Sequence, residues 1–114
     1  MSRDWRLYLD DMLLCCENVT EYVGTMTREQ FLGTKLVSHA VLHNLEILGE
    51  AAKHLPDDVK GRMPEVAWRE IAGMRDWISQ VYYRVDLDIV WDAVENKVPE
   101  LLRALQSFKD KKQP

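Results

Sequence analysis

The sequence predicts an all-α protein, an antiparallel bundle of four main helices with short accessory helical turns. Apolar residues recur at three- and four-residue steps through most of the chain, and no segment has the alternating pattern of a strand. The 114 residues are 46% hydrophobic and include only 5 Gly and 4 Pro, as is typical of one globular domain. We therefore expect a single helical domain over residues 1–114, with residues 109–114 frayed.

Residues 4–22 are expected to form the first main helix, because their apolar residues fall on one helical face. That face carries Trp5, Tyr8, Leu9, Met12, Leu13, Cys16, Val19 and Val23. Gly24 ends the helix. Thr27 and Gln30 then have the spacing of a capping box, which predicts a short helical turn through Phe31.

A second main helix is predicted over residues 34–54. It ends at Leu55 and Pro56, after which Asp57 and Asp58 are expected to cap a brief helical turn. A loop-rich connection punctuated by Gly and Pro leads to the next helix.

The third main helix is expected to begin near Ala67, with room for a bend at Gly73, and to end at Tyr82 or Tyr83. Asp86 is a good N-cap for a last helix over residues 87–108. Pro99 lies inside that last pattern, and it predicts a kink or local break near residues 95–99.

The charge of the chain argues against a protein that holds long nucleic acid on a broadly basic surface. The formal net charge is −4, and that mode of binding needs many Lys and Arg contacts to phosphates, so DNA binding is not expected. A cleft with a few Arg residues can still attract RNA, and a homodimer presents each Arg twice.

The N-terminus and the cysteines indicate a cytoplasmic protein. No apolar signal segment follows Met1, and no run of about 18 apolar residues is present, which disfavours secretion and membrane spanning. Cys15 and Cys16 are adjacent, a spacing that does not readily close a disulfide, and we expect them to be small apolar residues of the interior.

Arg75, Gln80 and Tyr82 are the candidate site residues of the third helix. Five residues separate Arg75 from Gln80, about 140° around the axis, whereas Arg75 and Tyr82 lie on nearly the same face. Because the three do not share one face, a complete site is expected to need a second copy across a two-fold axis.

The run from Arg75 to Tyr83, RDWISQVYY, resembles the signature of the HepT-like HEPN toxins. In that signature an Arg is followed after four residues by His, any residue and Tyr, often within GMRD and VDLDIVW, both of which occur here. The resemblance extends through residues 40–53, which contain Leu-Gly-Glu-Ala, and through residues 68–94.

The resemblance implies a ribonuclease that works without a metal or other cofactor, as a helical homodimer whose paired motifs line a cleft. The motif His acts as acid or base and the Arg holds the scissile phosphate, the role implied for Arg75. The Tyr two residues after the His is AMPylated by a minimal nucleotidyltransferase antitoxin, which implies that Tyr82 is the modified residue. Asp76 matches an acidic residue often found beside the Arg.

Gln80 occupies the position of the motif His. An amide can hold a substrate through hydrogen bonds but cannot exchange a proton near pH 7, and loss of general acid-base catalysis lowers a rate by about two to four orders of magnitude. We therefore expect impaired RNA cleavage, unless another His substitutes. Two origins of Gln80 stay open: natural drift to a non-catalytic partner, and a deliberate substitution that allows a toxic protein to be expressed. The alternative function is a non-catalytic helical dimer that binds or regulates a nucleotidyltransferase.

A second polar group lies on the predicted helix over residues 34–54, where four side chains fall within about 60° of one another. They are His39, His43, Glu46 and Glu50. Three interpretations are open: a solvated or cleft-lining face, a part of the RNA cleft, and a metal site. The order is the reverse of the Glu-x-x-His pairs in ferritin-like sites and only one helix carries it, so we expect no metal. His43, Glu50 and Asp76 are the candidate cleft-lining residues.

Overall fold

A computed structural model describes residues 3–80 and 86–112, except the side chains of Trp77, Ser79, Gln80 and Lys112. The elements are α1 (Trp5–Val23), α2 (Arg28–Leu32), α3 (Lys35–Lys53), α4 (Asp57–Gly61), α5 (Trp68–Gln80), α6 (Leu87–Asp92), the π-helical segment η2 (Ala93–Lys97) and α7 (Val98–Lys112). No strand occurs in these two ranges. The all-α prediction is confirmed. None of the helices described is both long and apolar enough to cross a membrane.

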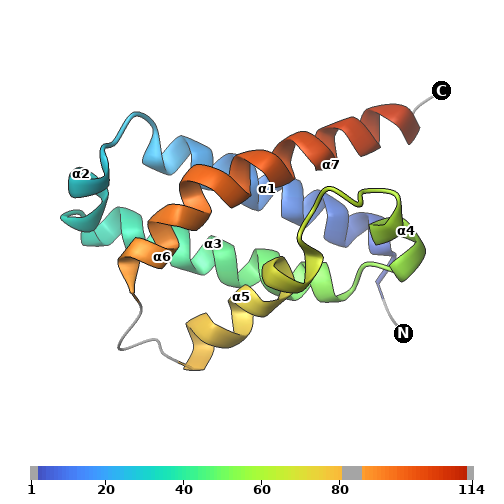
Figure 1. Ribbon diagram of the computed structural model, residues 1–114, viewed down its shortest axis with the longest axis horizontal. Coiled ribbons are helices and arrows are strands. Elements are labelled where there is room, and N and C mark those ends of the chain that lie inside the picture. The colour runs from blue at the N-terminus through green and yellow to red at the C-terminus, as the bar shows by residue number, and fades with distance from the viewer. Residues whose placement is uncertain (1–2, 81–85, 113–114) are drawn as a thin grey trace.

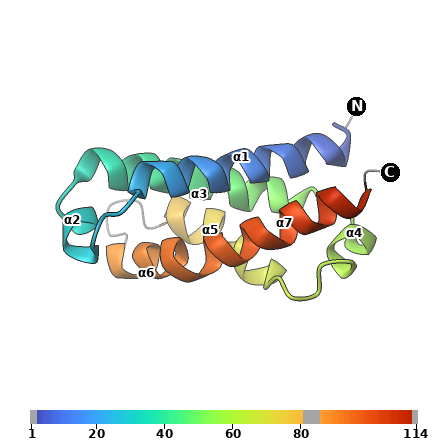
Figure 2. The same ribbon diagram turned by 90° about the horizontal axis from the view of Figure 1, so that it is seen from above.

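Four long rods make up the bundle, namely α1, α3, α5 and the continuous run from α6 through η2 to α7 (Figure 1). Successive rods run in opposite directions, and Figure 2 shows α1 and α3 side by side above α5 and α7. The main contacts join α1 to α3, α3 to α5, and α1 to α7. The helix α3 therefore lies between α1 and α5, and α5 packs against it.

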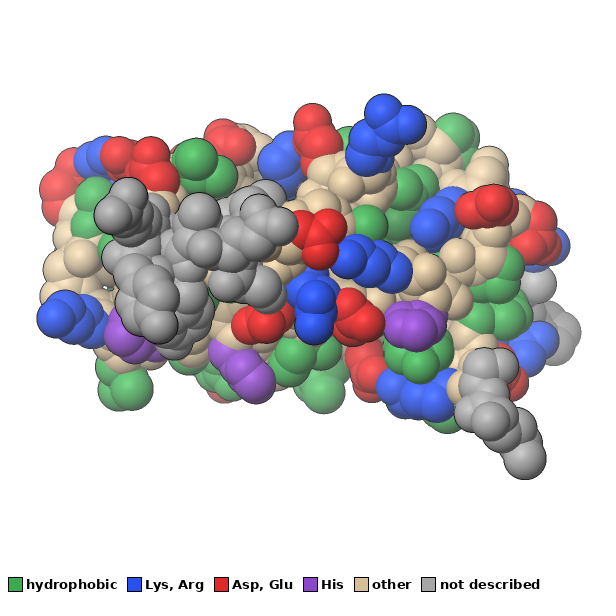
Figure 3. Space-filling view, turned by 90° about the horizontal axis from the view of Figure 1, so that it is seen from below, with side chains coloured by type: hydrophobic (Ala, Val, Ile, Leu, Met, Phe, Trp, Pro, Cys, Tyr) green, Lys and Arg blue, Asp and Glu red, His purple; other side chains and the backbone are tan. Residues whose placement is uncertain are grey.

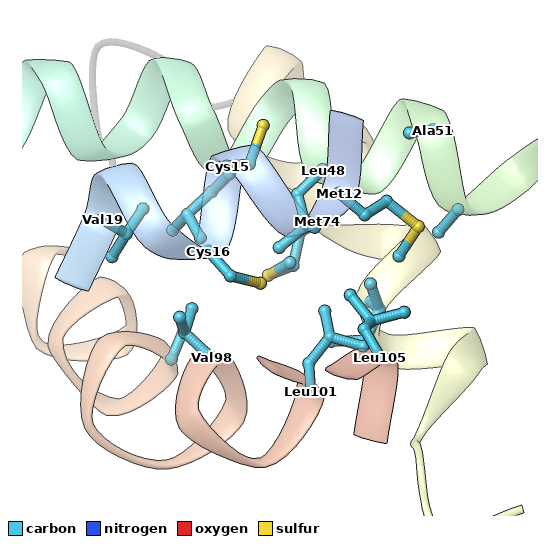
Figure 4. Packing of buried hydrophobic residues seen from close by; sticks show 14 of the residues in the cluster. Met12, Cys15, Cys16, Val19, Leu48, Ala51, Met74, Val98, Leu101 and Leu105 are labelled. Atoms are coloured by element: carbon cyan, nitrogen blue, oxygen red, sulfur yellow. The ribbon is translucent and has the colours of Figure 1, made fainter. Parts of the chain in front are cut away.

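The core lies where the four rods meet (Figure 4). Met12 of α1, Leu48 of α3, Met74 of α5 and Leu101 of α7 are each at most 2% exposed. Full burial of such a side chain contributes about 1.5–3 kcal/mol. Met74 directly precedes Arg75, so the burial of Met74 fixes where α5 presents the residues that follow.

Two of the predicted helix starts, those of α2 and α6, have the expected side-chain caps. The Thr27 hydroxyl accepts from the Gln30 backbone N–H at 3.2 Å, and the Gln30 side chain accepts from the Thr27 N–H at 2.9 Å, which completes the capping box. Asp86 caps α6 by accepting from the Asp88 N–H at 2.9 Å. Gly24 ends α1 with a φ of 54°, in the region that favours glycine.

Two helix boundaries differ from the sequence prediction. Pro56, not an Asp, is the N-cap of α4, because Asp57 and Asp58 already lie in its first helical turn and make no side-chain cap. The helix α7 continues past Phe108 to Lys112, and Lys109 forms an ion pair with Asp10 of α1 at 2.9 Å.

The third helix is continuous through Gly73, and Gln80 is its last described residue. The predicted end at Tyr82 or Tyr83 lies outside the described residues.

The break predicted near Pro99 takes the form of η2. The Val98 N–H donates to the Ala93 carbonyl, an i to i−5 hydrogen bond. A proline ring inside an α-helix collides with the carbonyl four residues earlier, and the wider π turn accommodates the ring without ending the rod.

Candidate functional site

Close backbone contact between α3 and α5 determines which residues meet at the candidate site. A Cβ at Gly49 would lie 2.8 Å from the backbone nitrogen of Arg75 and 3.0 Å from the carbonyl oxygen of Ile71. Only a residue without a side chain allows this approach. The contact brings Arg75 beside the residue that follows Gly49.

That residue, Glu50, forms an ion pair with Arg75. The Arg75 Nε lies 2.8 Å from the Glu50 Oε2, and the two side chains are 42% and 45% exposed. Glu50, one of the candidate cleft-lining residues, therefore lies beside Arg75. The pair involves the Nε side of the guanidinium, whose two terminal nitrogens form the fork that suits a phosphate.

A second ion pair joins the same two helices one residue further along α5. The Lys53 Nζ donates to the Asp76 Oδ1 at 2.8 Å. This hydrogen bond and the Lys53 charge, with a further contribution from Arg75, hold the pKa of Asp76 below its usual value. Asp76 is thus an anion near neutral pH, tied to α3.

His54 and Tyr8 extend the group toward α1, and sequence reasoning missed both. The His54 Nε2 lies 3.5 Å from the Glu50 Oε1, and the His54 ring stacks on Tyr8 with centroids 4.4 Å apart and planes 8° apart. The Arg3 guanidinium also lies over the Tyr8 ring, 4.5 Å from its centroid. The spacing of four residues between Glu50 and His54 was the signal available in the sequence.

The remaining predicted residues are not brought into this group by any described contact. Gln80 is the last residue of α5, its side chain is outside the described part, and Tyr82 lies wholly outside it. His39 and His43 are exposed on α3. Among the described residues, no three His, Cys, Asp or Glu side chains gather as metal ligands.

The resulting surface carries charges of both signs. Figure 3 looks onto this side of the molecule and shows Lys or Arg side chains in contact with Asp or Glu side chains near its centre. Among the described residues, the ion pairs of Arg75 with Glu50 and of Lys53 with Asp76 join charges of opposite sign between α3 and α5. The arrangement can bind an anion through Arg75, and none of the described groups in contact with Arg75 is a histidine.

Comparison with known proteins identifies the family. The model of the family described as "Ribonuclease HepT-like" matches residues 12–108. The "Probable ribonuclease HepT" of Thermococcus cleftensis is 39% identical over 101 residues, which cover 89% of this chain and 92% of that protein. "Putative RNase MJ0127" of Methanocaldococcus jannaschii is 35% identical over 107 residues, 94% of this chain and 88% of that protein. No solved structure matches. The chain belongs to the HepT-like ribonuclease family.

Proposed function

We propose that this chain is the RNA-cleaving half of a cytoplasmic toxin-antitoxin pair, in a form whose catalysis is weakened by Gln80. The observation that carries the proposal is the half-exposed Arg75 of α5, whose Nε lies 2.8 Å from the Glu50 carboxylate of α3. The chain that carries it belongs to a ribonuclease family. Arg75 binds the scissile phosphate through its guanidinium.

Cleavage without a metal needs two proton transfers besides phosphate binding. One group removes the proton of the 2′-hydroxyl, which attacks the neighbouring phosphorus, and another gives a proton to the leaving 5′-oxygen. Histidine performs either transfer because its pKa lies near 6.5. Gln80 cannot, so the proposed protein binds RNA and cleaves it slowly.

The active assembly is proposed to be a homodimer. Arg75 and residue 80 are about 140° apart around a helix axis, so one copy of α5 does not aim both at one phosphate. A two-fold axis brings the motif of a second copy to the same cleft.

The proposed antitoxin is a minimal nucleotidyltransferase that adds AMP to Tyr82. An added phosphate next to the motif places negative charge where RNA must bind, and like charges repel. Incubation of the two proteins with ATP, followed by mass spectrometry of peptides, should locate the added mass on Tyr82. AMP found only on another residue would contradict this assignment.

Restoring the motif tests the ribonuclease proposal. We expect Gln80→His to cleave a fluorescent RNA about 10²–10⁴-fold faster than the chain with Gln80, because a general acid-base group returns. Arg75→Ala in the Gln80→His protein should remove that gain. Equal cleavage with Gln80 and with His at position 80 would contradict the predicted impairment.

A second function, a non-catalytic helical dimer that binds a nucleotidyltransferase, is favoured by Gln80 itself. It predicts that Gln80→His remains inactive and does not inhibit growth, while the chain still forms a complex with the nucleotidyltransferase. Cleavage and growth inhibition by Gln80→His would contradict it.

A further inference from the structure

Glu50 is the side chain best placed to control Arg75. Its Oε2 contacts Nε, the guanidinium nitrogen nearest the backbone, at 2.8 Å. Phosphates are bound most strongly by two parallel N–H groups, and one such fork is formed by the terminal nitrogens. A carboxylate on the Nε side can therefore set the plane of the guanidinium while a phosphate binds elsewhere on it.

The backbone explains why Glu50 meets Nε. Gly49 lets α3 approach α5 very closely: a Cβ added at Gly49 would lie 2.8 Å from the Arg75 nitrogen and 3.2 Å from the Arg75 Cβ. The neighbouring Glu50 consequently reaches the Nε of Arg75.

Glu50 is held from its other side as well. Its Oε1 lies 3.5 Å from the Nε2 of His54, which stacks on Tyr8 of α1. Each carboxylate oxygen thus faces a different nitrogen. A carboxylate with a partner at each oxygen fixes the orientation of its neighbour better than one with a single partner.

We infer that Glu50 is a positioning residue for Arg75: it orients the guanidinium through Nε and stays in place while the terminal nitrogens bind the phosphate of RNA. The inference rests on the proposed function, since it assumes that Arg75 binds phosphate. Its rival is that Glu50 competes with RNA for Arg75. Half-exposed ion pairs contribute little to binding free energy or stability, so the main effect of Glu50 is on geometry.

Two substitutions separate these roles. Glu50→Gln keeps an oxygen that can contact Nε but removes the charge, whereas Glu50→Ala removes both. Asp10→Asn is the matched control, because it takes one negative charge from the ion pair with Lys109 between α1 and α7. Binding is measured with a short RNA and the chain that carries Gln80, and kcat and KM are measured in the Gln80→His protein.

Positioning predicts that Glu50→Ala lowers kcat about ten- to a hundred-fold, the cost of misplacing a group that contacts substrate. RNA affinity should not weaken, since a negative charge is lost. Glu50→Gln should restore most of the kcat. Competition instead predicts that both substitutions tighten RNA binding equally and leave kcat unchanged, a result that would overturn the inference.

A direct readout uses the Arg75 Nε–H signal in a ¹⁵N NMR spectrum, assigned with Arg75→Lys. We expect Glu50→Ala to shift this signal, and we expect it to stay near its original position when RNA binds the unmodified chain. An RNA-induced shift that matches the shift in Glu50→Ala would mean that RNA displaces Glu50. If Arg75→Ala does not weaken RNA binding, the proposed function itself fails. That result differs from one in which the substitutions at Glu50 leave kcat unchanged.

Discussion

Gly49 of α3 lies against the backbone of Arg75, so closely that a Cβ on Gly49 would be 2.8 Å from the Arg75 nitrogen. The crowding atoms belong to the backbone of a helix, which cannot rotate away as a side chain can. The distance between α3 and α5 at the candidate site therefore depends on one missing methyl group.

Gly49→Ala should destabilise the protein. A methyl group placed 2.8 Å from Arg75 N and 3.0 Å from Ile71 O forces α5 away from α3. Overpacking of this kind costs about 1–3 kcal/mol, which is partly offset by the roughly 0.8–1.0 kcal/mol gained when alanine replaces a helical glycine. Urea unfolding measures the change in the free energy of unfolding. A stability equal to or above that of the parent would mean that α5 moves at no cost.

Gly73→Ala should have the opposite effect and serves as the matched control. Gly73 lies within α5, and a Cβ there would meet nothing within 4 Å. Alanine in a helix interior is more favourable than glycine by about 0.8–1.0 kcal/mol, so the midpoint of urea unfolding should rise. A lower midpoint would indicate that Gly73 supports a bend, as the sequence alone allowed.

Local patterns predicted the helices well because their causes are local. The capping box of Thr27 and Gln30 depends on residues three apart, and the effect of Pro99 depends on the carbonyl four residues earlier. The N-cap of α4 was assigned to an Asp because Asp favours that position. Proline takes it instead, with a φ of −62° and an extended ψ of 149°, a backbone conformation that proline adopts readily.

The site was predicted less completely because its contacts join different helices. Arg75 and Glu50 were each identified, yet their pairing depends on the contact at Gly49, which has no local pattern. Lys53 was not identified as the partner of Asp76, nor His54 as a partner of Glu50. One sequence does not reveal which faces of α3 and α5 meet.

Asp76 should titrate below the ordinary aspartate value. The Lys53 hydrogen bond and charge lower its pKa in the folded protein, so this pair adds stability above the unfolded-state pKa of about 3.9. That stability is lost as the pH falls through the folded-state value. NMR titration of the Asp76 carboxyl carbon measures the pKa.

Lys53→Met should raise the Asp76 pKa toward about 3.9. Lys109→Met, which removes an ammonium from the ion pair with Asp10, should leave Asp76 unchanged. An Asp76 pKa that is the same with and without Lys53 would show that another group lowers it.

Cys15 and Cys16 should be unreactive in the folded protein. They are 4% and 0% exposed, and burial raises their pKa to about 11 and about 12, so at pH 8 both are neutral thiols. The thiolate is the reactive form, and we expect a thiol reagent to modify both residues at the rate of global unfolding. Rapid labelling of either cysteine in the absence of urea would contradict their burial.

The same pKa shifts predict a loss of stability at high pH. An unfolded thiol ionises near pH 8.5, so the folded state binds the protons more tightly and its advantage is complete below that pH. As the pH rises toward about 11, the free energy of unfolding should fall more steeply in the parent than in the double variant Cys15→Ala, Cys16→Ala. The alanines lower stability at every pH by leaving cavities, so only the slope reports the thiols. Parallel slopes between pH 8 and pH 11 would mean that the thiols ionise alike in both states.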